Sequence, residues 1–202
     1  MRKNKIYIYA VVFAALIIAI LGNIHTEISE DLEIYEKTLR LHIPANSDDK
    51  DDQELKLKVR DAVIKVLSEP LSACKTKEDA EAVAKRMTPI IKQTAERVIS
   101  ENGKDYSASV TLTEEYYPKK EYDGITLPAG KYSSLKIELG EAKGQNWWCV
   151  LFPQVCTGTA RAEETLAEVG FTSNQIHLLT DQEKGEYKVK FKIVEIIKRL
   201  FG

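Results

Sequence analysis

The sequence predicts an α+β protein: an antiparallel sheet of about four strands with helices packed on one face, preceded by an N-terminal signal or anchor helix. Three observations support this fold class. Apolar residues recur at helical spacing over residues 49–67 and 79–99, whereas residues 108–113 and 135–140 alternate with period two. Residues 147–152 then form an unbroken apolar run, which is typical of a strand inside a core. Because the helices come first and most strands later, the order favours an α+β fold.

The N-terminal segment, residues 1–22, differs from the rest of the chain. Three basic residues lie within the first five positions, and a charge-free apolar run follows over residues 6–21. A basic start before an apolar centre is the layout of a secretory signal. The run is slightly short for a spanning helix, which needs roughly 17–25 residues. A cleaved signal peptide and an uncleaved membrane anchor are therefore both open, and in either case the basic end stays cytoplasmic and the remainder is exported.

The exported part is predicted to be a single domain over residues 37–202, separated from the membrane by an acidic spacer over residues 23–36. About 180 residues are enough for one domain with a hydrophobic core. Its first strand is predicted over residues 37–43, where apolar and polar side chains alternate, and Pro44 ends it.

The first helix of the domain is predicted to run to Leu67 and to end before Pro70, because proline breaks a helix. Its apolar side chains form one stripe, and most of its charged side chains lie on the solvent side. Two acidic pairs offer alternative capping arrangements at its start: Asp49 with Asp52, or Asp51 with Glu54.

The second helical region begins with Thr76 and Asp79, which have the spacing of a capping box. Pro89 interrupts the region, and Thr88 is placed to cap a new helix. The pattern therefore predicts either two helices in tandem or one kinked helix. Gly103 ends the region, as glycine commonly does after a helix.

Residues 108–113, 135–140 and 147–152 are predicted to form an antiparallel meander. Gly140 and Gly144 lie in its last connection, where they can adopt positive φ. Beyond the meander, the sequence predicts three more elements: a short helix over residues 159–169 capped by Gly170, a strand over 187–191, and a helix over 193–200.

The composition excludes several classes of function. The chain has 29 basic and 31 acidic residues, so it lacks the positive charge expected of a nucleic-acid-binding protein. Its three histidines show no metal-ligand spacing, and no glycine-rich phosphate loop or nucleophile elbow is present. We therefore expect no metal, no cofactor and no small-molecule substrate.

Three cysteines in an exported chain allow one disulfide, between Cys149 and Cys156, and leave Cys74 as a free thiol. An alternative hypothesis is a cell-envelope hydrolase that uses Cys149 as a thiolate nucleophile and His42 as its base. Against it, Cys149 lies in an apolar run, which raises the pKa of a thiol and makes it inert.

Two parts of the chain resemble the signatures of the stage II sporulation protein R family. The first part is Arg40–Asp48 followed by Asp52–Val63. The second is Leu127–Tyr132 followed by Gly144–Pro153 and then Cys156. The two together make the resemblance specific, and the remaining C-terminal residues add nothing to it.

The resemblance implies a signalling protein of endospore-forming bacteria that is made in the forespore and exported into the space between the two membranes. There it would activate a membrane-bound aspartic protease of the mother cell, which then cleaves pro-sigma-E. We expect activation by binding, with no catalysis by the protein itself and with membrane contact only through its N-terminal segment. A structural domain that tethers envelope layers is a third hypothesis.

Five residues are candidates for contacting the protease or shaping the contact surface. Tryptophan is favoured at binding hot spots, and polar groups at the end of the first strand are available either for a partner or for satisfying the turn locally. The candidates are His42, Asn46, Asp48, Trp147 and Trp148.

Overall fold

The computed structural model describes residues 9, 12–19, 33–122, 125–154 and 162–180. Residues 12–19 are helical, but the predicted N-terminal segment lies largely outside the described residues. Among those residues, no helix combines the length and apolar character needed to cross a membrane. The strand predicted over 187–191 and the helix predicted over 193–200 also lie outside them.

The centre of the molecule is a four-stranded sheet with the order β2-β5-β1-β6. Its strands are β1 Leu39–Pro44, β2 Ala108–Tyr117, β5 Gly130–Leu139 and β6 Asn146–Phe152. β1 pairs in parallel with β5 and antiparallel with β6, while β2 pairs antiparallel with β5. The sheet is therefore mixed, and the predicted antiparallel arrangement is wrong.

The N-terminal strand β1 separates β5 from β6, which the predicted meander would have paired directly. Every residue of β1 is buried except His42, which is half-buried. A strand covered on both faces is favoured inside a sheet, whereas an edge position would expose its backbone. The alternating pattern of residues 37–43 shows one buried face but does not show that the other face is covered too.

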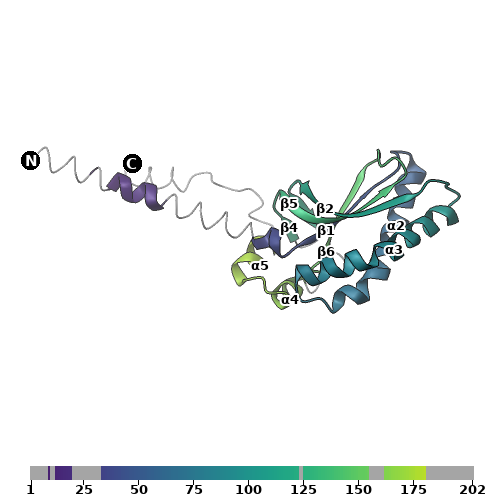
Figure 1. The fold of residues 1–202 in the computed structure, drawn as a ribbon. Coiled ribbons are helices and arrows are strands. Elements are labelled where there is room, and N and C mark those ends of the chain that lie inside the picture. The colour runs from purple at the N-terminus through teal and green to yellow at the C-terminus, as the bar shows by residue number, and fades with distance from the viewer. Residues whose placement is uncertain (1–8, 10–11, 20–32, 123–124, 155–161, 181–202) are drawn as a thin grey trace, which may run out of the picture.

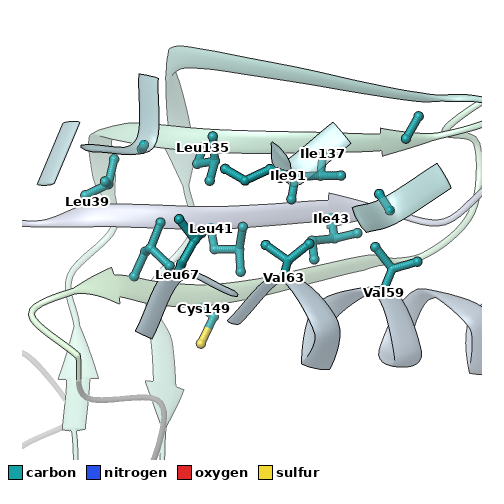
Figure 2. Packing of buried hydrophobic residues seen from close by; sticks show 14 of the residues in the cluster. Leu39, Leu41, Ile43, Val59, Val63, Leu67, Ile91, Leu135, Ile137 and Cys149 are labelled. Carbon is teal, nitrogen blue, oxygen red and sulfur yellow. The ribbon is translucent and has the colours of Figure 1, made fainter. Parts of the chain in front are cut away.

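Two long helices, α2 Lys50–Ser72 and α3 Lys77–Glu101, cover one face of the sheet (Figure 1). Figure 2 shows their apolar side chains meeting those of β1 and β5. Burying each aliphatic side chain of this size contributes roughly 1.5–3 kcal/mol, so this layer is the main source of stability. Its labelled members are Leu39, Leu41, Ile43, Val59, Val63, Leu67, Ile91, Leu135, Ile137 and Cys149.

The helix signals were predicted with mixed success. The capping box of Thr76 and Asp79 is present. Pro89 lies inside a single continuous α3, so the tandem-helix alternative is wrong, and Thr88 donates its hydroxyl to the Ala84 carbonyl instead of capping a helix. Pro70 also lies inside its helix, in the last turn of α2, so the predicted end before Pro70 is wrong even though proline removes one i→i−4 hydrogen bond.

The start of α2 differs from both predicted capping arrangements. Asp49 is the N-cap residue, but its side chain makes no capping hydrogen bond. Asp52, its predicted partner, is instead buried and faces the loop that follows β1. Asp51 lies in the first turn, where a negative charge favours the helix dipole.

A second apolar cluster covers one end of the opposite sheet face. It is built by the hairpin of β3 Lys120–Tyr122 and β4 Ile125–Leu127, and by the helices α4 Ala162–Glu168 and α5 Ser173–Thr180. The hairpin and α5 were not predicted, and α4 begins later than the predicted helix, whose first residues lie outside the described part. The other end of this face stays open to solvent.

Candidate functional site

The open end of the sheet face carries a row of side chains that crosses all four strands. Thr111 on β2 pairs with Lys136 on β5, Lys136 pairs with His42 on β1, and His42 pairs with Trp148 on β6. Side chains at paired positions point to the same side of a sheet. We call the surface formed by this row, together with the neighbouring Glu115, Glu138, Asn146 and Lys120, the open face.

Hydrogen bonds hold the polar side chains of the open face in place. Nδ1 of His42 lies 3.0 Å from a carboxylate oxygen of Glu115, and its Nε2 lies 2.8 Å from Oδ1 of Asn146. Lys136 contacts Glu138 at 2.8 Å and Glu115 at 3.7 Å. The hydrogen bond to Glu138 raises the pKa of Lys136, which therefore stays charged. The side chain of His42 is 13% exposed, so its ring is ordered before any partner arrives.

Aromatic rings adjoin these polar groups. The ring of Trp148 lies 6.0 Å from that of His42 and 6.1 Å from that of Tyr117, measured between centroids. Lys120 Nζ lies 5.9 Å from the Trp148 ring. Trp148 is half-buried, so part of its ring remains available to a partner. A partly exposed tryptophan beside a charged side chain is a common feature of binding surfaces.

Next to the open face, on the same side of the sheet, lies a fully buried arginine. Arg40 has 0% exposure, and its Nε donates to the Cys149 carbonyl at 3.1 Å while Nη2 donates to the Tyr122 hydroxyl. Its guanidinium also lies 4.2 Å from the Tyr117 ring and 4.9 Å from the Tyr132 ring. Nη1 has no hydrogen-bond partner among the described residues. Arg40 thus links Tyr122 of the β3–β4 hairpin to the sheet, at the boundary between the open face and the second apolar cluster.

The loop after β1 contains two predicted contact residues, and both are used internally. Asn46 Oδ1 accepts from the backbone N–H of Glu141 at 2.9 Å, and its Nδ2 donates to Asp52 at 2.7 Å. Asp48 Oδ1 accepts from the backbone N–H of Gln145 at 2.7 Å. Both side chains therefore shape the loop and join it to the turn between β5 and β6.

A buried carboxylate holds this loop together. Asp52 is 3% exposed and accepts hydrogen bonds from Asn46, Ser47 and Tyr106, while Lys104 Nζ lies 3.2 Å away. Burial alone would raise the pKa of Asp52, but the four donors outweigh it and lower the pKa to about 2. The pKa of Tyr106 is raised, first by burial and then by Asp52. The carboxylate is therefore ionised throughout the neutral range.

Two glycines allow the loop and the turn to approach each other. A Cβ at Gly140 would lie 2.2 Å from Asn46 Oδ1, and one at Gly144 would lie 2.1 Å from the Ser47 backbone oxygen. Gly140 has φ +56°, which confirms its predicted positive φ, whereas Gly144 does not have a positive φ. The two parts that carry the family resemblance are thus in direct backbone contact.

Trp147 lies on the opposite side of the sheet from Trp148. Its ring packs at the edge of the helix-side core, with the Arg60 guanidinium 4.3 Å from its centroid. Its Nε1 is buried without a hydrogen-bond partner among the described residues. The two tryptophans therefore serve different surfaces, and Trp147 is separate from the open face.

Cys149 and His42 do not form a catalytic pair. Cys149 is opposite Leu41 in the β1–β6 register and belongs to the helix-side core, whereas His42 lies on the open face. Cys149 is disulfide-bonded, and its predicted partner Cys156 lies outside the described residues. The free Cys74 is half-buried, and burial raises the pKa of its thiol.

Sequence reasoning missed several members of the site. Glu115 and Lys136 were not singled out as site residues, and Arg40 was predicted only as a polar residue of an alternating strand. The alternating pattern of β2 and β5 could have shown that Glu115 and Lys136 lie on the polar side of these strands. Placing the two residues beside His42 also required the strand order of the sheet. Within the described ranges, no group of His, Cys, Asp or Glu side chains could hold a metal ion.

Comparison with known proteins gives two matches. The family described as Stage II sporulation protein R (spore_II_R) matches residues 35–162. The chain is also 32% identical over 223 residues to the "Stage II sporulation protein R" of Bacillus subtilis (strain 168), covering 99% of this chain and 100% of that protein. No solved structure gives a significant match.

Proposed function

Because the chain belongs to the stage II sporulation protein R family, with a role in sporulation, we propose that it is an exported signal that activates a membrane-embedded aspartic protease by binding. The protease would then process pro-sigma-E in the mother cell. The basic and apolar N-terminal residues support export across the cytoplasmic membrane into the space between forespore and mother cell. In that space the domain could act either released or held by its N-terminal segment.

We assign the contact with the protease to the open face. The observation that carries this assignment is the ordered row of His42, Lys136 and Trp148 at the end of the sheet face that no described helix covers. Lysine and glutamate side chains lie there next to the partly exposed Trp148. Because hydrogen bonds already order these side chains, binding a partner would cost little conformational entropy. Asn46 and Asp48 act through the loop that supports the row, not by direct contact.

Activation by binding requires that the protein bind the active state of the protease more tightly than the inactive state. Each step of about 1.4 kcal/mol in differential affinity changes the ratio of the two states tenfold. Protein–protein contacts centred on one tryptophan commonly supply differences of this size.

The test is co-expression of the full chain with the protease and pro-sigma-E, with cleavage followed by immunoblotting. We expect Trp148→Ala to abolish cleavage and Lys120→Glu to reduce it at least threefold. Lys120 is exposed, so its substitution does not disturb folding. The matched control is Tyr116→Ala, which removes an aromatic ring that is 74% exposed and lies on the other side of the sheet.

Cleavage at the wild-type level by both Trp148→Ala and Lys120→Glu would refute the assignment to the open face. Urea unfolding of each variant separates a loss of contact from a loss of fold. A variant without residues 1–22, exported by an unrelated signal, distinguishes signalling from tethering. A diffusible signal still triggers cleavage in that form, whereas a tether does not.

A further inference from the structure

We propose that the outer edge of β2 pairs with β2 of a second copy of this chain, so that the two four-stranded sheets become one. β2 is an end strand of the sheet and pairs only with β5 among the described strands. It contains 10 residues, and its register with β5 is regular over the whole length. An exposed strand edge presents unpaired N–H and C=O groups that another strand can bond.

The other end of the sheet shows how this protein protects an edge. β6 has 7 residues, its register with β1 shifts at Leu39/Arg40, and Pro153 follows it directly. Short length, a bulge and a neighbouring proline all discourage pairing with another chain. β2 is longer, its register with β5 is regular, and it contains no lysine, arginine or proline, although Pro118 follows it directly as Pro153 follows β6. The contrast in length and regularity favours β2 over β6 as the edge that pairs with another strand.

The residues of β2 are complementary to themselves in an antiparallel arrangement. When Thr111 lies opposite its own copy, Ser109 lies opposite Thr113 on the open side and Val110 lies opposite Leu112 on the helix side. Cross-strand pairs of hydroxyl side chains and of aliphatic side chains are both favourable. In the same register Glu114 faces Ala108, so no like charges oppose each other. This favours a second copy over an unrelated strand as the occupant.

The helix layer has the right width for such a dimer. Four strands span about 19 Å at a spacing of about 4.8 Å, and two helices of about 10 Å diameter cover that width. α2 and α3 supply these two helices, and α3 is the one that packs on β2. In the dimer, the two copies of α3 would lie next to each other without opening a gap in the layer.

The dimer would place both open faces on the same side of one continuous sheet. Trp148 of each copy lies on β6, three strands from the joined edge. At about 4.8 Å per strand, the two tryptophans would be about 34 Å apart. The pairing itself does not depend on the proposed function. If that function holds, the dimer could bring two protease molecules together.

The test uses the position that would lie on the twofold axis. Thr111 is exposed, so Thr111→Lys and Thr111→Glu should each fold normally, and each would oppose its own charge in a homodimer. We expect the wild-type full chain, purified in a mild detergent, to dimerise with increasing concentration in sedimentation velocity. Each variant should weaken dimerisation by about tenfold or more, because like charges directly opposite one another repel.

An equimolar mixture of Thr111→Lys and Thr111→Glu should restore the dimer, since the opposed charges now attract. Ser72→Lys adds the same charge at the exposed end of α2 and is the matched control, expected to dimerise as the wild type. A wild-type chain that stays monomeric up to its solubility limit would overturn the proposal. So would two single variants that dimerise as well as the wild type, which would indicate contact through another surface.

Discussion

Replacing Asp52 by asparagine should destabilise the protein strongly, although it only replaces one carboxylate oxygen by an NH2 group. Two donors, Asn46 Nδ2 and the Ser47 hydroxyl, share one carboxylate oxygen, and Tyr106 and Lys104 share the other. An amide offers one accepting oxygen, so two donors lose their acceptor whichever way it is oriented. A buried donor without an acceptor costs about 1–3 kcal/mol, and we expect a total loss of about 2–4 kcal/mol at pH 7.

The pKa of Asp52 gives an independent measure of the same effect. A fall from 3.8 to about 2 in the folded state corresponds to about 2 kcal/mol of stabilisation at neutral pH. Because the folded pKa is the lower one, this contribution is fully present above the unfolded pKa and is lost as the pH falls through the folded pKa. Roughly half of it should be gone by pH 3.

Urea unfolding followed by the fluorescence of the two tryptophans measures both quantities. The free-energy difference between wild type and Asp52→Asn should be largest at pH 7 and should shrink by about 1 kcal/mol at pH 3. Asp51→Asn is the matched control, since Asp51 is exposed in the same helical turn and should cost less than about 1 kcal/mol. Equal losses for the two variants at pH 7, or a difference that does not change with pH, would refute this account of the loop.

Two further substitutions test the contacts on either side of the open face. Gly144→Ala should destabilise the protein by about 2–3 kcal/mol in the same urea experiment, because the new Cβ would clash with the backbone of Ser47. The control is Gly103→Ala: Gly103 has φ +73°, but a Cβ there would have nothing within 4 Å, so this substitution should cost only about 1 kcal/mol. Arg40→Lys should lower stability by about 2 kcal/mol or more and weaken the near-ultraviolet circular dichroism of the tyrosines, because an ammonium cannot stack on their rings as a guanidinium does. Unchanged spectra for Arg40→Lys would show that the arginine does not order the hairpin.

Local signals predicted most of the elements but not their arrangement. The capping box at Thr76 and the glycine after α3 are set by backbone groups within a few residues, and both were found. The position of β1 between β5 and β6 depends on which faces become covered by distant segments. The breaks predicted at Pro70 and Pro89 were wrong for a related reason: the packing of α2 and α3 on the sheet outweighs the hydrogen bond that each proline removes.

The same distinction holds for the candidate site. His42 was selected as a polar group at the end of the first strand and Trp148 by its residue type, and the structure brings them together on the open face. Trp147 was selected for the same reason but lies on the other side, since adjacent strand residues point in opposite directions. Glu115 could not be placed beside His42 from sequence, because their contact spans 73 positions and passes through the strand order.

The loop after β1 explains why the two parts that carry the family resemblance occur together in one chain. The first part supplies Asn46 and Asp48, whose side chains accept from backbone N–H groups of the turn before β6. The second supplies the glycine at 144 that lets this turn approach, and then Trp148 itself. A change in the loop therefore moves the start of β6, and with it the pairing of Trp148 with His42. For this reason we expect substitutions of Asn46 or Asp48 to impair the proposed activation of the protease without either residue contacting it, and to do so in proportion to their effect on stability.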